Sequence, residues 1–428
     1  MPFHMAQSVA AATPSVSRLQ RIAEAFAERN LRLLLTANLC NDLAMWAYNI
    51  ALGWLVFDLT GSPFQLGVAF SIRGAAFILG GLSGGAFADR FDRRAVVEFI
   101  QAIMVVMVAT LGFVALFGTL ETWHLYLATI AVAGCHGVGN PTRQSMFRDV
   151  VEPGKLASAV SINAIGMNLT RLIGPAGAGA FLKTLGAEGV FFFSAGTWII
   201  TIFAITRITK PRQSSQEKKE PFFQSLANGI AYARRYQAIA AILLLTIVFN
   251  LIAMSFQQLM SAYAKKELEL GAAGFGAIMS VMGAGAVAGA TFASVKGAKL
   301  ANGNVFIAAV TLVGLALIGT GVTQHLGAVV PLLVVIGFTS GVAMSVSMVL
   351  VQTKVEDAYR GRVMGLYMLT FGLQYVAALP IGSIAEGIDT PATFVLMGAI
   401  TAVATCIVAI WAPAIRRVAS RASTRPAS

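Results

Sequence analysis

Three ionisable side chains lie inside apolar stretches that are each long enough to cross a bilayer: Asp42, Arg73 and Arg171. At about 1.5 Å per helical residue, Asp42 lies about 15 Å into its stretch and Arg73 about 14 Å into the next. Arg171 lies near the middle of a third stretch. An isolated charge at the centre of a bilayer costs about 3 kcal/mol or more, so such groups are expected to form ion pairs or to have a role in function. We therefore expect the three side chains to meet in one midplane cavity.

This trio supports two kinds of chemistry. In the first, Asp42 forms a structural ion pair with one arginine. In the second, Asp42 is a proton-coupling acid, because a proton, a substrate and a guanidinium group compete for one carboxylate and proton uptake then drives substrate release. Two cations against one anion leave a positive surplus, which suits an anionic or catechol-bearing substrate.

Polar residues accompany the charges at helical spacing in the first and seventh stretches, Gln374 lies in the eleventh, and Trp46 and Tyr367 are candidates for stacking on a flat substrate. Hydrogen bonding between helices is the alternative for the amides, and packing is the alternative for the aromatic rings. A histidine in the fourth stretch is either a proton relay or a buried neutral side chain. The expected cavity residues are Asn38, Asn41, Trp46, Asn49, His136, Asn250, Gln257, Tyr367 and Gln374.

The elements that position these residues are twelve apolar runs. A membrane span needs about 20 apolar residues. Charged residues make up 12% of the chain and the mean hydropathy is +0.75. The run lengths exclude a transmembrane β-barrel, whose strands have about ten alternating residues. We expect an all-α membrane protein with spans at 32–57, 64–87, 95–118, 123–147, 156–183, 188–208, 238–263, 272–294, 304–323, 327–353, 360–386 and 391–413.

The basic residues predict the orientation. Most of the 31 lysines and arginines fall at the termini and in connections on the same side, whereas Lys183, Lys265 and Lys266 fall on the other. Positively charged connections stay in the cytoplasm, so we expect both termini to be cytoplasmic in a bacterial-type inner membrane. The net charge of +12 would suggest nucleic-acid binding in a soluble protein. Here the basic residues lie in short connectors rather than on one folded face, so no nucleic acid is expected.

The chain repeats itself. Asn41, Ala44 and Met45 recur as Asn250, Ala253 and Met254, 209 positions later. The same offset relates Gly67, Ser71, Gly74 and Gly80 to Gly276, Ser280, Gly283 and Gly289. Parallel halves of six spans place a substrate site at their interface, so transport is the expected class of function.

Five segments follow from this repeat. A cytoplasmic amphipathic segment and a polar, Pro- and Ser-containing linker with an amphipathic helix from Phe222 to Tyr236 flank the first bundle. The expected segments are 1–31 (N-terminal amphipathic segment), 32–208 (first six-helix bundle), 209–236 (linker), 237–413 (second six-helix bundle) and 414–428 (basic tail).

The connection after the second span carries a spaced motif of glycine and charged residues. Its bland interpretation is a charged turn that enforces topology. Its residues are Gly85, Asp89, Arg90, Arg93 and Arg94. This spacing resembles the signature loop of the major facilitator superfamily, although Asp92 stands where that family usually has glycine. The resemblance implies two pseudo-symmetric six-helix bundles and a conformational latch made by these residues.

The fifth span carries Gly174-Pro175-Ala-Gly177-Ala-Gly179. Small residues allow close helix packing, which is the structural alternative. The motif, with Gly174, Pro175 and Gly179, resembles the exporter motif of the same superfamily, although Thr170 and Ala178 depart from it. The stretch from Asn140-Pro141-Thr-Arg143 into this span resembles the enterobactin-exporter-like branch, which includes siderophore and drug exporters.

We therefore expect a secondary transporter, a proton-coupled exporter of siderophore- or drug-like small molecules that works by alternating access. An uptake carrier or uniporter of the same fold, and a non-transporting sensor or accessory protein, are the alternatives. The sequence has no nucleotide-binding loop and no metal-ligand spacing around Cys40, Cys135 or Cys406, so neither enzymatic activity nor a cofactor or metal is expected. The expected partners are the substrate, protons and lipid, and we expect a monomer.

Overall fold

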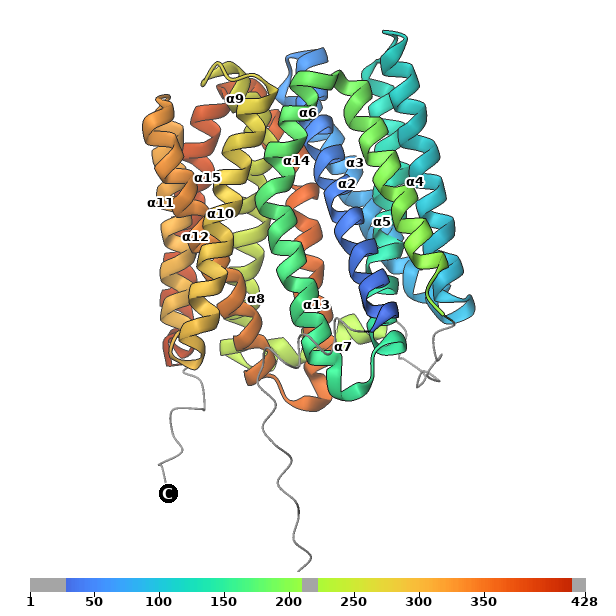
Figure 1. Ribbon diagram of the computed structural model, residues 1–428. Helices are drawn as coiled ribbons and strands as arrows, with labels where there is room; N and C mark the ends of the chain where they lie inside the picture. Colours follow the sequence, from blue (N-terminus) through green and yellow to red (C-terminus); the bar gives the residue numbers. More distant parts are fainter. Residues whose placement is uncertain (1–27, 210–221, 418–428) are drawn as a thin grey trace, which may run out of the picture.

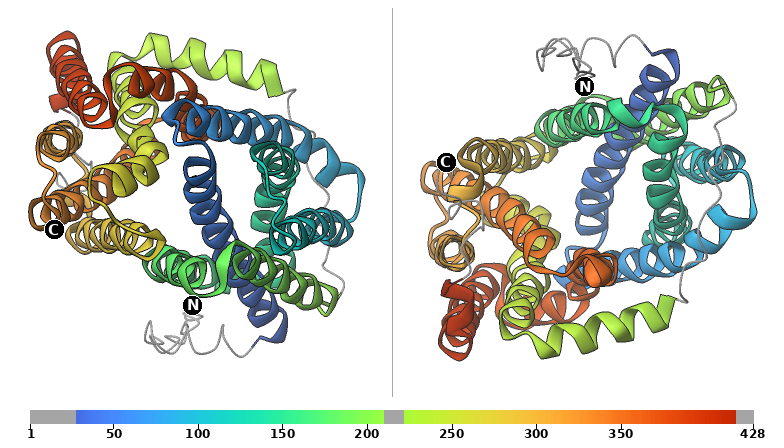
Figure 2. Two further views of the ribbon diagram at one scale, coloured as in Figure 1. Left: turned by 90° about the horizontal axis from the view of Figure 1, so that it is seen from above. Right: turned by 90° about the horizontal axis from the view of Figure 1, so that it is seen from below.

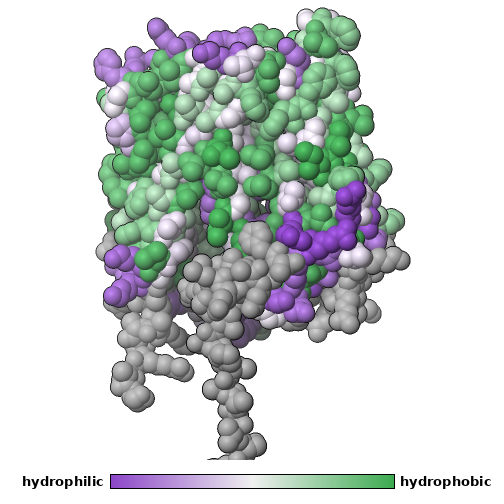
Figure 3. All heavy atoms as spheres, viewed as in Figure 1, coloured by the Kyte–Doolittle hydropathy of each residue, from purple (hydrophilic) through white to green (hydrophobic). Residues whose placement is uncertain are grey.

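The computed structural model describes residues 28–209 and 222–417, and these residues form long helices that run side by side (Figure 1). The expected all-α membrane fold is confirmed. Most of the expected N-terminal amphipathic segment and of the basic tail lies outside the described residues. A broad apolar band covers the face in Figure 3, and hydrophilic residues gather at its two ends, as expected for a protein that crosses a bilayer.

The helices keep the predicted order. They are α2 (Arg29–Thr60), α3 (Pro63–Arg90), α4 (Arg93–Leu116), α5 (Thr122–Val150), α6 (Leu156–Thr206), α7 (Phe222–Arg235), α8 (Gln237–Val248), α9 (Met260–Lys266), α10 (Ala272–Lys296), α11 (Gly303–Val322), α12 (Leu326–Lys354), α13 (Asp357–Val376), α14 (Ala378–Ile388) and α15 (Thr390–Trp411). Within the described ranges, ten helical segments are long and apolar enough to cross a membrane.

Helix α6 covers two predicted spans. It has 51 residues and bends at Gly186, which adopts a φ of 69° that favours glycine. A straight helix of that length would measure about 75 Å, whereas the hydrocarbon core is about 30 Å thick. Two crossings joined at Gly186 fit these dimensions, and the count of twelve crossings stays a prediction.

Two groups of helices divide the molecule (Figure 2). In the first, α2 packs on α6, and α3 packs on α5; in the second, α10 packs on α12, and α11 packs on α15. The groups meet where α3 contacts α13 and α14, and where α6 contacts α10. Glycine permits these approaches: a Cβ atom on Gly179 would lie 2.9 Å from the Cα atom of Gly276.

The signature loop is organised by charge contacts. Asp92 caps the N-terminus of α4, where its side chain accepts a hydrogen bond of 2.8 Å from the Arg94 backbone N–H. Buried Arg93 donates to Asp149 at 2.6 Å, and Arg94 donates to Glu98 at 2.7 Å. Gly85 and the side chains of Asp89 and Arg90 lie outside the described set, so the latch stays a prediction.

Helix α7 follows the linker and lies across the ends of the bundle helices (Figures 1 and 2). Its buried Tyr232 stacks on Tyr359 of α13, with ring centroids 4.4 Å apart and an interplanar angle of 15°. A Cβ atom on Gly229 would lie 3.1 Å from the Arg362 carbonyl oxygen. The apolar face of this helix is therefore anchored to the second half.

Candidate functional site

A cavity of about 400 Å³ lies between the two halves. Its walls come from α2, α3, α5 and α6 of the first half, and from α10, α12, α13 and the interrupted segment between α8 and α9 of the second. Most of the sequence-predicted site residues come together here. Those that line the cavity are Asp42, Trp46, Asn49, Arg73, His136, Arg171, Asn250, Gln257 and Gln374.

Three of the expected cavity residues do not line it, and each of them makes hydrogen bonds between or along helices. Asn38 donates to Asn163 at 2.9 Å. Asn41 donates to Asp42 at 3.2 Å and accepts a bond of 3.0 Å from Gln101. The Tyr367 hydroxyl is bonded to Ser347 at 3.0 Å, and its side chain is buried.

Asp42 has a cationic neighbour that the sequence analysis did not place in the site. Arg143 on α5 interacts electrostatically with Asp42 and is only 4% exposed. Gly139 makes room for it, since a Cβ there would lie 2.9 Å from Arg143 Nη1. Within the part of the chain that the structure describes, this Nη1 has no hydrogen-bond partner. Half-buried Asp42 and buried Arg143 therefore interact through space at the cavity wall, with no ion pair within 4.0 Å between them.

The two predicted arginines lie on another side of the cavity. The Arg73 guanidinium carbon lies 4.4 Å from the centroid of the Tyr375 ring, which belongs to α13 of the other half. Arg171 lines the same cavity as Tyr375. Among the described residues, neither arginine has a carboxylate within 4.0 Å. This side of the cavity is consequently positive.

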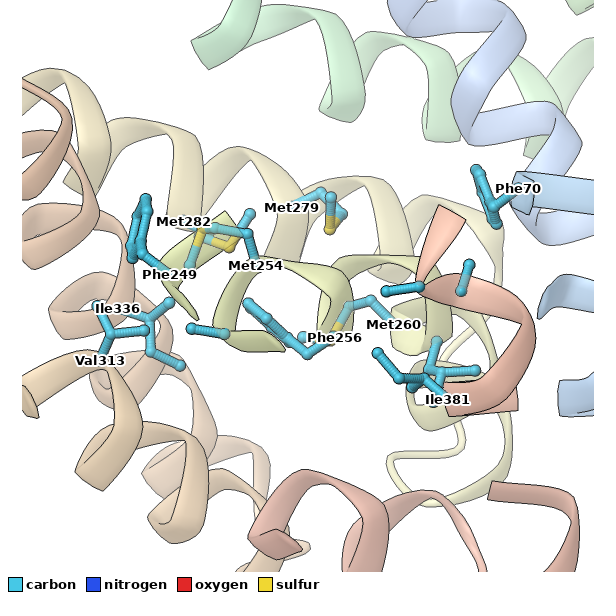
Figure 4. Close-up of a cluster of buried hydrophobic side chains, with 14 of the residues drawn as sticks. Phe70, Phe249, Met254, Phe256, Met260, Met279, Met282, Val313, Ile336 and Ile381 are labelled. Atoms are coloured by element: carbon cyan, nitrogen blue, oxygen red, sulfur yellow. The ribbon is translucent and has the colours of Figure 1, made fainter. Parts of the chain in front are cut away.

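The second half contributes through interrupted helices. Between α8 and α9 the chain forms a π-turn, Phe249–Ala253, and then a 3₁₀ turn, Met254–Leu259. Asn250 donates from this π-turn to Thr370 at 3.1 Å, while Gln257 faces the cavity. Phe249 and Phe256 of this segment belong to the apolar core (Figure 4). Such local unwinding is frequent at functional sites.

The rest of the lining is apolar and adaptable. Methionine side chains are flexible and polarizable, so they adjust to ligands of irregular shape. Aromatic rings add flat surfaces for stacking. The methionines and phenylalanines in the lining are Met45, Met167, Met254, Met279, Met344, Phe70, Phe275 and Phe371.

Comparison with known proteins supports the architecture. A family model described as transmembrane secretion effector, within the major facilitator superfamily, matches residues 23–426. A solved structure of a POT family transporter in complex with 5-aminolevulinic acid superposes with a TM-score of 0.73 at 14% identity, covering 91% of this chain and 97% of that one. At that identity the likeness concerns the fold.

Curated relatives cover most of the chain. The staphyloferrin A transporter of Staphylococcus aureus is 24% identical over 83% of this chain and 89% of its own length. The multidrug efflux pump Tap of Mycobacterium tuberculosis is 25% identical over 86% of this chain and 90% of its own. The enterobactin exporter of Escherichia coli is 23% identical over 78% of this chain and 80% of its own.

Proposed function

We propose a specific mode of transport for this chain, which belongs to the transmembrane secretion effector family of the major facilitator superfamily and is therefore a multi-pass membrane transporter. In this proposal the protein is a proton-coupled exporter of small organic molecules, of siderophore or drug type. It lies in a bacterial inner membrane with both termini in the cytoplasm. The observation that carries it is a cavity between two halves in which Asp42 is the one carboxylate among the described lining residues, with the buried Arg143 on α5, one of the helices of the wall.

Proton coupling requires a group whose charge changes where the substrate binds. Asp42 is the one carboxylate among the described lining residues. When Asp42 is ionised, it balances Arg143; when it is protonated, the cationic surplus of the cavity rises. A proton and a cationic partner thus compete at Asp42, and a change in its charge alters the field that a substrate meets.

The contacts between the halves support alternating access. Among pairs of described residues, the hydrogen bonds between the two halves lie either near the middle of the helices or at the end of the molecule opposite the two termini. Lys265 is ion-paired with Asp58, and Ser62 donates to Glu386 at 2.9 Å. Such contacts stabilise one state of a two-state equilibrium and break in the other. The names of the curated relatives, which include efflux pumps and an exporter, favour export as the direction.

The test uses inside-out membrane vesicles and two fluorescent probes, fluorescein as an aromatic anion and ethidium as an aromatic cation. The expected result is uptake of at least one probe that requires an imposed proton gradient. The Asp42→Asn variant should still bind the probe but lose the response to the gradient. Uptake that survives full dissipation of the gradient in the wild type would contradict proton coupling and favour a uniporter.

A further inference from the structure

Two guanidinium groups at the cavity have no acidic partner among the described residues. Arg73 is 9% exposed and lines the cavity, and Arg171 lines it from α6. The ion pairs of the described chain involve other residues. Removing a charge from water without pairing it is unfavourable, so these groups will favour any anion that reaches them.

Asp42 does not satisfy this demand. Asp42 forms no ion pair within 4.0 Å with Arg73 or Arg171. Its electrostatic interaction is with a third arginine, Arg143, which is buried on α5 and is not part of the lining. With His136 counted as neutral, the lining and the arginine behind it carry three guanidinium groups against one carboxylate. The cavity keeps its positive surplus even when Asp42 is ionised.

Tyr375 holds one of the free guanidinium groups in place. The Arg73 guanidinium carbon lies 4.4 Å from the Tyr375 ring centroid, within the range of a cation–π contact. The backbone of Tyr375 is fixed in turn, because Ser71 Oγ lies 3.2 Å from its carbonyl oxygen. A planar guanidinium group presents a fork of donors that matches the two oxygens of a carboxylate. Arg73 is thus arranged for an acidic oxygen group.

The remaining lining is suited to the body of such a molecule. Trp46, Phe275 and Phe371 offer rings, and methionine side chains fill the spaces between them. Asn49 also faces the cavity, and its Oδ1 atom is buried with no hydrogen-bond partner among the described residues. This acceptor suits a hydroxyl or N–H group on the ligand.

We propose that the cavity selects organic polyanions, that is, molecules with a flat or apolar body and two or more acidic oxygen groups. Arg73 and Arg171 bind the acidic groups, the aromatic and methionine side chains contact the body, and Asn49 accepts a hydrogen bond from it. This assignment rests on the proposed transport function and names its substrate class.

The experiment measures binding rather than transport. The purified protein in lipid nanodiscs is titrated with fluorescein, a dianion at slightly alkaline pH, and with rhodamine 6G, a cation built on the same three-ring system. Fluorescence anisotropy is read against empty nanodiscs. We expect fluorescein to bind at least about tenfold more tightly, and Arg73→Gln and Arg171→Gln each to weaken it about tenfold. A tenfold change corresponds to about 1.4 kcal/mol.

Arg207→Gln is the matched control, because Arg207 also stacks on an aromatic ring, Phe203, but does not line the cavity. Its binding should equal that of the wild type. Asp42→Asn should increase the affinity for fluorescein several-fold, because it removes the one carboxylate among the described lining residues. This variant tests the proposal even if an arginine variant fails to accumulate.

Equal binding of the two dyes, no fluorescein binding at millimolar concentration, or unchanged affinity in Asp42→Asn together with Arg73→Gln would overturn the polyanion assignment. Gradient-driven uptake of ethidium in the vesicle assay would still stand in that case. The failure of the substrate class is therefore separable from failure of the transport function.

Discussion

At the residue scale, the cavity separates two roles that arginine can play. Arg143 is buried outside the lining and interacts electrostatically with Asp42, whereas Arg73 and Arg171 face the cavity and form no ion pair within the described chain. A single acid with three arginines around it can respond to a proton while the cavity stays cationic. This division makes proton binding and substrate binding chemically distinct.

The pairing of Asp42 with Arg143 is testable by a double-mutant cycle. Arg143→Gln leaves Asp42 without its counter-charge, and Asp42→Asn leaves the buried guanidinium unbalanced, so each single change should lower thermal stability. The double variant should recover part of the loss, with a coupling of about 0.5–3 kcal/mol. Melting temperatures in detergent measure this cycle. Additive losses would show that the two residues act independently.

The sequence predicted much of the cavity, and its omissions have physical causes. Asn41 and Asp42 are adjacent, so their side chains point about 100° apart on a helix, and Asp42 faces the cavity while Asn41 bonds to Gln101. Arg143 enters the sequence analysis only through the branch motif, near the end of the predicted fourth span. Helix α5 continues to Val150, and the Arg143 side chain is buried among the helices.

At the element scale, two serines related by the internal repeat bind to proline-containing helices of the opposite half. Ser71 of α3 accepts a bond of 2.9 Å from the Leu379 N–H, beside Pro380, and lies 3.1 Å from the Val376 carbonyl oxygen. Proline has no N–H, so that carbonyl lacks its helical donor. Ser280 of α10 accepts a bond of 2.8 Å from the Ala176 N–H, beside Pro175. Each half thus supplies a serine hydroxyl to the backbone beside a proline of the other.

Removal of either hydroxyl should favour the state in which the halves separate at that end. We expect Ser71→Ala and Ser280→Ala each to shift the equilibrium by about 1 kcal/mol, or about fivefold, and the double variant to shift it further. Single-molecule energy transfer between labels at residues 58 and 265 reports the populations. Ser83→Ala is the matched control, because Ser83 bonds only to carbonyls of its own helix, α3. An equal effect of all three changes would contradict a gating role.

Helix α7 depends on a tyrosine contact with α13. Tyr232→Ala removes both the stack on Tyr359 and a hydroxyl that accepts a 3.2 Å bond from the Glu356 backbone N–H. An aromatic pair contributes about 0.5–1.5 kcal/mol, so trypsin cleavage at the exposed Arg234 and Arg235 should become several-fold faster. Tyr232→Phe retains the stack and should behave almost as the wild type. Unchanged cleavage in Tyr232→Ala would show that other contacts hold α7.

The neighbouring Tyr236 gives this anchor a pH dependence. Its hydroxyl donates to Glu356 at 3.1 Å, and this bond raises the pKa of Tyr236, because ionisation of the phenol beside a carboxylate is unfavourable. The bond therefore stabilises the contact at pH values below the ordinary pKa of tyrosine, and this stabilisation is lost as the pH rises through the raised pKa of Tyr236. Cleavage of wild-type protein should accelerate in alkali, and Tyr236→Phe should remove that part of the response.

The interruptions of the helices were only partly readable from the sequence. Pro380 signals the break between α13 and α14, although the break lies at Ala377, several residues earlier. The π-turn at Phe249–Ala253 contains neither proline nor glycine. Contacts with α13 accompany it: Asn250 of the turn donates to Thr370, and Ser255, just after the turn, donates to the Gln374 carbonyl at 2.9 Å. Such contacts with a distant helix leave no local pattern.

At the scale of the whole molecule, the repeat in the sequence becomes a repeat in the contacts. Gly67 faces Gly382 across α3 and α14, and Gly276 faces Gly179 across α10 and α6. The sequence alone shows the offset of 209 positions that relates Gly67 to Gly276. It does not show which glycines these two contact, because that depends on how two separate halves meet. The cavity lies between these two contact lines, so relative motion of the halves changes access to it.

Motion of the halves as units leads to a cross-linking prediction with an internal control. Lys265 and Asp58 form an ion pair between the halves, whereas Lys155 and Glu28 form one inside the first half, at 2.8 Å. Cysteines are introduced at either pair after Cys40, Cys135 and Cys406 are replaced by alanine, and a short cleavable dithiol-reactive linker joins them. The Asp58→Cys, Lys265→Cys link should abolish probe uptake, because it prevents separation of the halves at that end, and reduction should restore it. The Glu28→Cys, Lys155→Cys link should leave most of the flux. Full transport with the first pair cross-linked would mean that the halves need not separate there, and the alternating-access mechanism would fail.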